Sequence, residues 1–275
     1  MNTEFWGPSA WKFLHTIVAI YPIKGLTLTD KLMMRDFMQI LCDILPCKYC
    51  RASFTQYSNS LEITPYLESN ILIQEWLYKM HNKVNSKLRR QGLCTKENPS
   101  FEHIVNIYNM KVKNILDILN KDSKNSKCMT IINYICNLGI DFLGSIIFNY
   151  QGYSANCHTN EEKTKITSTY HKFFNMIQPM ICKYITKLNQ QADSYQIIKL
   201  KIRHILLQNE PYSKLKQWFY QCDFICLDKQ FKTLEEYENH FNKHIVSFCN
   251  NPKIEIKSCR KLTKKRNIEH IHNKK

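Results

Sequence analysis

The stretch Leu45-Pro46-Cys47-Lys48-Tyr49-Cys50 decides how the rest of the chain is interpreted. A proline directly before a C-x-x-C pair predicts that the pair lies at the start of a helix, because proline fits the first helical turn. That end of a helix favours a thiolate, since its N–H groups and its dipole stabilise negative charge. A thiolate can attack a disulfide, bind a metal or donate charge to a flavin, so three chemistries remain open.

The composition is typical of a globular, helix-rich protein. The chain has 275 residues, of which 44% are hydrophobic and 23% charged, enough for one large or two modest domains. Only 6 glycines and 8 prolines occur, which favours long helices over tight turns. Apolar side chains recur at helical spacing over most of the length, so we predict an all-α protein.

Positive charge is concentrated at the C-terminal end of the chain. The formal net charge is +16, and residues 253–275 hold nine Lys or Arg against two Asp or Glu. This basic tail is either a solvated segment that aids solubility or a segment that binds nucleic acid or another polyanion through Lys264, Lys265 and Arg266.

The beginning of the chain and its cysteine content bear on its location. Met1 is followed by Trp6-Gly7-Pro8 without a cationic start and an apolar run, so we expect no signal peptide. Twelve cysteines without an export signal favour redox activity or metal binding over a secreted disulfide scaffold. We therefore expect a cytoplasmic protein.

The most membrane-like segment is residues 130–148, which is nearly as long as a bilayer span. Asn133, Asn137 and Asp141 interrupt it at i, i+4 and i+8, on one face of a helix. A polar stripe at this spacing is typical of an amphipathic core helix, so we do not expect a membrane span.

Four helices and a short fifth are predicted within residues 1–105. The first ends at Tyr21-Pro22, the second runs from Thr29-Asp30 through Leu45, the third begins at Pro46, the fourth runs from Ser69 to about Arg90, and the fifth begins at Pro99-Ser100. On the fourth helix, His81 and Asn85 lie one turn apart beside apolar neighbours. They either bind a polar ligand along the helix or lie at the surface.

Several motifs occur in a fixed order over about residues 4–105. They are Trp6-Gly-x-x-x-Trp11-x-x-x-His15, Tyr21-Pro22, Pro46-Cys47-x-x-Cys50-x-x-x-Phe54, Trp76-Leu77 and His81-Asn82-x-Val84-Asn85-x-Lys87-Leu88. In this order and spacing the segment resembles the Erv/ALR family of FAD-linked sulfhydryl oxidases. A lone C-x-x-C would be weak evidence, but its combination with both flanking helix motifs is specific.

The resemblance implies a small bundle of four helices plus a short fifth, usually dimeric, with FAD at its mouth beside the dithiol. It implies that Cys50 lies next to the flavin and that Cys47 exchanges with the substrate. The residues that match cofactor-contact positions are Gly7, Trp11, His15, Tyr21, Trp76, His81, Asn82, Val84, Asn85 and Lys87. The implied reaction oxidises protein dithiols, with electrons passing through the C-x-x-C pair to FAD and then to molecular oxygen, which becomes H₂O₂.

Two departures from the family pattern are visible. The family commonly has a cysteine just after Trp-Leu, in a disulfide with one beyond the helix; here that position is Tyr78, while the expected partner Cys94 is present. The aromatic residue near the end of the domain, usually Trp, is Phe101. Neither change touches the redox pair, so we expect activity to be kept and the 92–101 loop to be less stable.

The resemblance also suggests a source. Disulfide-forming chemistry without an export signal would suit a large cytoplasmic DNA virus, whose members encode similar oxidases. By this analogy we expect the protein in the host cytoplasm or in the virion.

Residues 106–275 match no family in this way, and we predict a mostly helical accessory domain of unknown function. Helical periodicity continues through residues 104–119, 130–149, 166–188 and 195–208. Sulfhydryl oxidases often carry a second dithiol that relays electrons from bulky substrates, and Cys222 and Cys226 are the closest-spaced candidates.

The same two cysteines have a rival interpretation. With His240 and His244 they resemble a C₂H₂ zinc finger over residues 220–244, since two Cys and two His one helical turn apart can close a tetrahedral zinc site. This gives an alternative function, in which the first domain is a redox-inactive scaffold and the Cys/His module binds zinc and a partner or nucleic acid.

Overall fold

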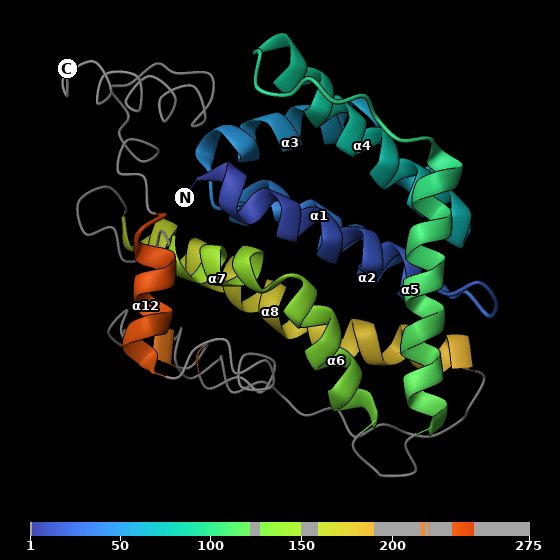
Figure 1. The fold of residues 1–275 in the computed structure, drawn as a ribbon. Coiled ribbons are helices and arrows are strands. Elements are labelled where there is room, and N and C mark those ends of the chain that lie inside the picture. The colour runs from blue at the N-terminus through green and yellow to red at the C-terminus, as the bar shows by residue number, and fades with distance from the viewer. Residues whose placement is uncertain are drawn as a thin grey trace.

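The regular elements are all helices, as predicted (Figure 1). The computed structural model describes residues 2–121, 127–149, 159–189, 216–217, 220 and 233–244. The predicted helix over 195–208 lies outside these residues.

The first four helices form a bundle and agree with the predicted ones. They are α1 (Thr3–Ala19), α2 (Leu28–Ile44), α3 (Lys48–Ser60) and α4 (Asn70–Arg90), with a short 3₁₀ helix η1 (Thr64–Glu68) before α4. α2 begins slightly earlier than predicted, because Thr27 and Asp30 form a reciprocal capping box. α4 ends before Gly92, whose φ of 67° suits glycine.

The remaining helices within the described ranges are α5 (Phe101–Lys121), α6 (Lys127–Leu138), α7 (Ile140–Phe148), α8 (Asn160–Asn189) and α12 (Leu234–Asn242). α5 has 21 residues where a short helix was predicted, and it continues across the predicted domain boundary at residue 105. The single helix predicted over 130–149 is two helices, which meet at 73°.

The bend between α6 and α7 lies at Gly139, which packs closely against α1. A Cβ atom on Gly139 would lie 2.8 Å from the Cβ of Phe13, so only glycine lets the chain pass this close to α1. Within the described ranges no single helix has the length and apolar character to span a membrane, although the bent α6–α7 pair together meets both criteria.

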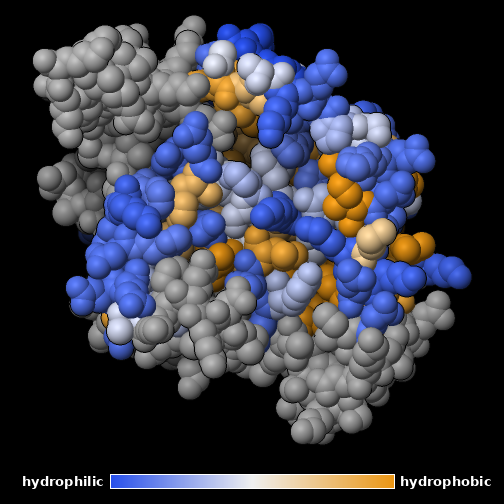
Figure 2. All heavy atoms as spheres, in the orientation of Figure 1, coloured by the Kyte–Doolittle hydropathy of each residue, from blue (hydrophilic) through white to orange (hydrophobic). Residues whose placement is uncertain are grey.

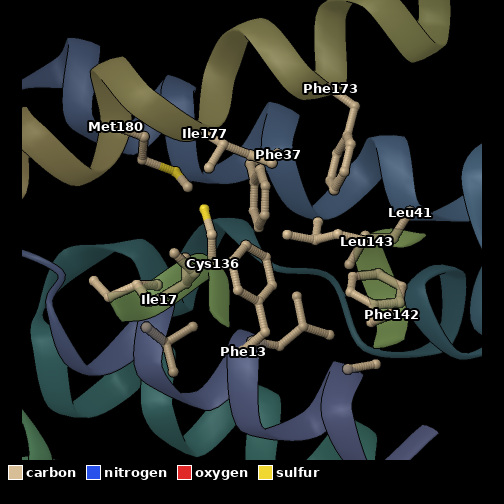
Figure 3. Close-up of a cluster of buried hydrophobic side chains, with 14 of the residues drawn as sticks. Phe13, Ile17, Phe37, Leu41, Cys136, Phe142, Leu143, Phe173, Ile177 and Met180 are labelled. Carbon is tan, nitrogen blue, oxygen red and sulfur yellow. The ribbon is translucent and has the colours of Figure 1, made fainter. Parts of the chain in front are cut away.

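The bundle and the accessory helices share one hydrophobic core (Figure 3). Phe37 of α2 stacks on Phe173 of α8 with ring centres 5.5 Å apart. Phe13 of α1 lies 6.1 Å from Phe142 of α7. Both Phe13 and Phe37 are fully buried. The core thus continues across residue 105, and the division into two domains stays a prediction.

A buried carboxylate, Asp30, joins α2 to α8. The carboxylate oxygens of Asp30 lie 2.9 Å from the Nζ of Lys183 and 2.5 Å from the Nζ of Lys187. The backbone carbonyl of Asp30 accepts a hydrogen bond from the Tyr184 hydroxyl. Burial by itself would raise the pKa of Asp30, but hydrogen bonds from Lys187, Thr27 and Lys183 lower it to about 2. Asp30 is therefore ionised at neutral pH and holds α8 against the bundle.

Candidate functional site

The dithiol lies at the N-terminus of α3, where the sequence placed it. Cys47 is the N-cap residue, with φ −130° and ψ 124°. Its carbonyl accepts hydrogen bonds from the N–H groups of Cys50, at 2.9 Å, and Arg51, at 3.0 Å. Cys50 is consequently in the first turn, close to the positive end of the helix dipole.

Both cysteines line a cavity of about 460 Å³. Its walls come mainly from α1, α3 and α4, with Tyr108 of α5, and they are mostly apolar. A volume of about 300–1,000 Å³ is usual for sites that bind organic ligands. Cys47 is 1% exposed, whereas Cys50 is only partly buried.

Most of the predicted cofactor residues gather at this cavity. Those that line it are Gly7, Trp11, His81, Val84, Asn85 and Lys87. His15 lies directly behind His81, and its Nε2 is 3.2 Å from the Nδ1 of that residue. The helical spacing of these residues on α1 and α4 therefore brings them to the dithiol.

Besides His15, three predicted cofactor residues lie away from the cavity lining. Tyr21 is buried, and its hydroxyl donates a hydrogen bond of 2.9 Å to the Leu67 carbonyl. Trp76 is buried too, and its Nε1 donates to the Leu61 carbonyl at 2.9 Å. Asn82 points to a different side of α4, where it lines a second hollow. Contact of these three with a cofactor stays a prediction.

Four rings form a column beside the cavity. Trp11 stacks on His81 with centres 3.8 Å apart and planes at 9°. His15 stacks on Tyr108 with centres 4.9 Å apart. The hydrogen bond between the two histidines joins these two stacks. Tyr108 was not predicted as a site residue; its helical spacing from Phe101 and Ile104 placed it only on the apolar face of the fifth helix.

Both histidines of the column are neutral at neutral pH. Burial, followed by repulsion from His81, lowers the pKa of His15 to about 3, and burial lowers the pKa of His81 to about 4. In the neutral pair one ring nitrogen donates and the other accepts. The column therefore presents an uncharged aromatic surface next to the dithiol.

The neutral pair predicts acid sensitivity. Because the folded pKa values lie below the 6.5 of a free histidine, the unfolded state binds more protons, and stability falls as the pH drops from about 6.5 to about 4. Urea unfolding at several pH values measures this slope. We expect His15→Gln to reduce it and His103→Gln, at an exposed position of α5, to leave it unchanged. Equal slopes in all three proteins would contradict a buried neutral pair.

The residues around the cavity fit a flavin dinucleotide. The Nε1 of Trp6 and the Oε1 of Gln91 are buried without a hydrogen-bond partner among the described residues, and both residues line the cavity. Such atoms call for a polar ligand. The rings of Trp11 and His81 offer stacking faces, and the ammonium groups of Lys12 and Lys87 could meet phosphates.

Polar contacts hold the 92–101 loop where the family disulfide is lacking. The Tyr78 hydroxyl donates to the Pro99 carbonyl at 2.9 Å. The Nδ2 of Asn85 donates to the Oδ1 of Asn98 at 2.9 Å. Cys94 is a free thiol that lines the cavity. Whether the loop is less stable than with the disulfide stays a prediction.

Only part of the predicted zinc site, Cys222, Cys226, His240 and His244, lies within the described residues. Cys222 and Cys226 lie outside them, as does the basic tail, residues 253–275. His240 pairs with the Asp141 carboxylate at 3.1 Å, and His244 stacks on Phe5 with ring centres 3.8 Å apart. Within the described ranges no group of three or more His, Cys, Asp or Glu could hold a metal. Zinc binding therefore has no support here.

A dithiol at a helix N-terminus, facing a ring-lined cavity in a helical bundle, is an arrangement suited to thiol-redox chemistry beside an aromatic group. Residues 8–104 match the model of the Erv1/Alr family. The all-α fold and the position of the dithiol agree with that family.

The relatives of the chain are named as FAD-linked sulfhydryl oxidases. The chain is 37% identical over 89 residues to the mitochondrial FAD-linked sulfhydryl oxidase ERV1 of Saccharomyces cerevisiae, covering 32% of this chain and 46% of the relative. It is 34% identical over 86 residues to the probable FAD-linked sulfhydryl oxidase R368 of Acanthamoeba polyphaga mimivirus, covering 31% and 59%.

An FAD-linked sulfhydryl oxidase of African swine fever virus is 26% identical over 112 residues, covering 41% of this chain and 87% of the relative. The chain spans about half the length of the first two relatives. No solved structure gives a significant match.

Proposed function

We propose that the chain is an FAD-dependent sulfhydryl oxidase that forms disulfides in protein substrates. The observation that carries this proposal is that Cys47 and Cys50 line the same cavity as Trp11 and His81. Thiol exchange and cofactor binding are thereby brought to one place. The relatives, which are named as FAD-linked sulfhydryl oxidases, support the same activity.

The thiol chemistry starts from the Cys47–Cys50 disulfide. A substrate thiolate attacks the sulfur of Cys47, so that a substrate–Cys47 bond forms and Cys50 leaves as a thiolate. The α3 N-terminus stabilises that thiolate. A second substrate thiolate then attacks the substrate sulfur of the mixed disulfide, which releases oxidised substrate and the Cys47 thiolate. Cys47 is the more buried cysteine, so this division of roles rests on the family resemblance.

The cofactor completes the cycle. FAD held in the cavity would supply the two-electron acceptor that lets the Cys47–Cys50 disulfide form again, with O₂ as the final oxidant and H₂O₂ as the product. The chain's own contribution is to place the dithiol, to offer the faces of Trp11 and His81, and to keep the His15–His81 pair uncharged. The buried Trp6 N–H and Gln91 carbonyl orient a polar ligand edge.

Location and assembly follow as proposals of the same kind. Relatives from viruses support a large DNA virus as source, and with it a place in the host cytoplasm or the virion. The homodimer implied by the resemblance stays a prediction. A second copy would have to dock beside the accessory helices, because α7 and α8 already pack on α1 and α2.

A visible absorption spectrum of the purified chain tests the function. We expect a flavin band that bleaches when a dithiol is added without air and returns when air is admitted. This reports the cofactor, the entry of electrons and the oxidant together. A protein that stays colourless after refolding with FAD would contradict the proposal.

A further inference from the structure

Positive charge is distributed very unevenly over residues 1–105. This segment has twelve Lys or Arg and nine Asp or Glu. Six of the twelve cations lie on α3 and on residues 80–91 of α4, two stretches that contain no acidic residue: Lys48, Arg51, Lys83, Lys87, Arg89 and Arg90. The rest of the segment has more acidic than basic side chains. The positive side of residues 1–105 is therefore formed by α3 and the C-terminal part of α4.

Lys79 of α4 pairs with Glu75, but the cations that follow it on this helix have no carboxylate partner among the described residues. Lys87 donates to the Ser53 hydroxyl at 2.5 Å, and Arg89 donates to the Lys96 carbonyl and to Asn98 and Ser86 side chains. All of these acceptors are neutral. Within the described residues, none of Lys83, Lys87, Arg89 and Arg90 lies within ion-pair distance of a carboxylate.

The positive side carries a second hollow, on a different side of α4 from the dithiol cavity. An open hollow of about 430 Å³ lies between the end of α3 and α4, lined by Tyr57, Leu61, Lys79, Asn82, Lys83, Ser86 and Arg90. Lys87, one turn along α4, lines the dithiol cavity itself. In Figure 2 hydrophilic side chains predominate at the upper right, where Figure 1 places α4.

We propose that this positive face, formed by Lys83, Arg89 and Arg90 of α4, selects thiol substrates whose cysteines lie in acidic polypeptide segments. The inference rests on the proposed oxidase function and adds its substrate class. We infer an acidic substrate from charge complementarity. A positively charged surface raises the local concentration of negatively charged substrates and speeds their association with the protein. Nucleic acid is also a polyanion, but it carries no thiols that the dithiol could oxidise. We therefore propose an acidic polypeptide as the binding partner.

Two peptide substrates and an uncharged dithiol test the proposal on the full chain with FAD. Both peptides carry a Cys pair, flanked by Asp and Glu in one and by Asn and Gln in the other. We expect kcat/KM from O₂ uptake to be about 10-fold higher for the acidic peptide at low salt. The difference should shrink as salt is raised, because ions screen exposed charges. Dithiothreitol should show no salt dependence of this kind.

Charge-reversal variants distinguish an effect of the positive face from an effect of the net charge of the chain. Lys83→Glu with Arg90→Glu should remove most of the preference and leave dithiothreitol turnover and flavin content unchanged. Lys113→Glu with Lys165→Glu, at exposed positions on α5 and α8, makes the same change in net charge away from the face. It should keep the preference.

Three results would overturn the proposal. They are equal kcat/KM for the two peptides at low salt, an equal loss of preference in the control pair, and loss of flavin from the Lys83→Glu, Arg90→Glu protein, which would assign the charges to the cofactor. DNA binding at the face together with equal peptide kinetics would assign it to nucleic acid. Failure of the oxidase function itself would be recognised separately, by absence of dithiothreitol turnover.

Discussion

Cys50→Ser is expected to abolish dithiol oxidation while the protein keeps its flavin. In the proposed mechanism the first-turn sulfur of α3 is the leaving group in the attack on the disulfide, and without it neither the disulfide nor a thiolate beside the cofactor would form. Loss of a residue that takes part in bond making typically lowers turnover by at least about 10³-fold. Oxygen uptake with dithiothreitol measures turnover, and the flavin absorption of the purified variant measures cofactor content.

Cys42→Ser is the matched control for this experiment. Cys42 is a partly buried free thiol on α2, outside the cavity lining. Its replacement should leave turnover within about 2-fold of the native protein, since a helical cysteine away from a site acts as a small apolar residue. Normal oxygen uptake by Cys50→Ser would refute the role given to this sulfur.

Asp30→Ala is expected to destabilise the whole chain by about 3–5 kcal/mol, because it leaves two lysines of α8 beside a buried site without their carboxylate. It also removes one half of the capping box of α2. The side chain of Asp30 is fully buried, whereas those of Lys183 and Lys187 are about a third and a fifth exposed. Chemical denaturation followed by circular dichroism measures the loss.

The low pKa of Asp30 adds a pH signature to this prediction. Since the folded pKa of about 2 lies below the 3.9 of a free aspartate, the contribution of Asp30 is complete above about pH 4 and disappears as the pH falls towards 2. The native protein and Asp30→Ala should therefore converge in stability at low pH. Asp43→Ala, at an exposed position of the same helix, should change stability by less than about 0.5 kcal/mol. A similar loss in both variants would show that the ion pairs contribute little.

The parts of the fold that the sequence predicts are those set by local rules. Apolar residues at helical spacing define α1 to α4, and proline before Cys47 places the dithiol at a helix start. The residues that line the cavity from α1 and α4 repeat at intervals of one helical turn. Their spacing in the sequence therefore predicts that they share one face of each helix and form one wall of a site. Trp11, His81 and Asn85 accordingly line the cavity, while their contact with a cofactor stays a prediction.

The parts that sequence reasoning missed depend on contacts between distant segments. Gly139, at the bend between α6 and α7, packs against Phe13, which lies more than a hundred residues earlier. Tyr108 enters the ring column because α5 packs on α1. Tyr21 and Trp76 match family positions, yet their polar atoms are satisfied by backbone carbonyls inside the bundle. Spacing along one helix contains no information about such partners.

The core shared by the bundle and the later helices is completed only late in synthesis on the ribosome. The face of the bundle formed by Phe13, Ile17 and Phe37 is covered by side chains that include Phe173 and Ile177 of α8. Synthesis at about 5–20 residues per second separates residue 105 from the end of that cover by several seconds. During this interval the nascent bundle carries an uncovered apolar face, so chaperone binding should be strongest before α8 emerges and should decline once it docks.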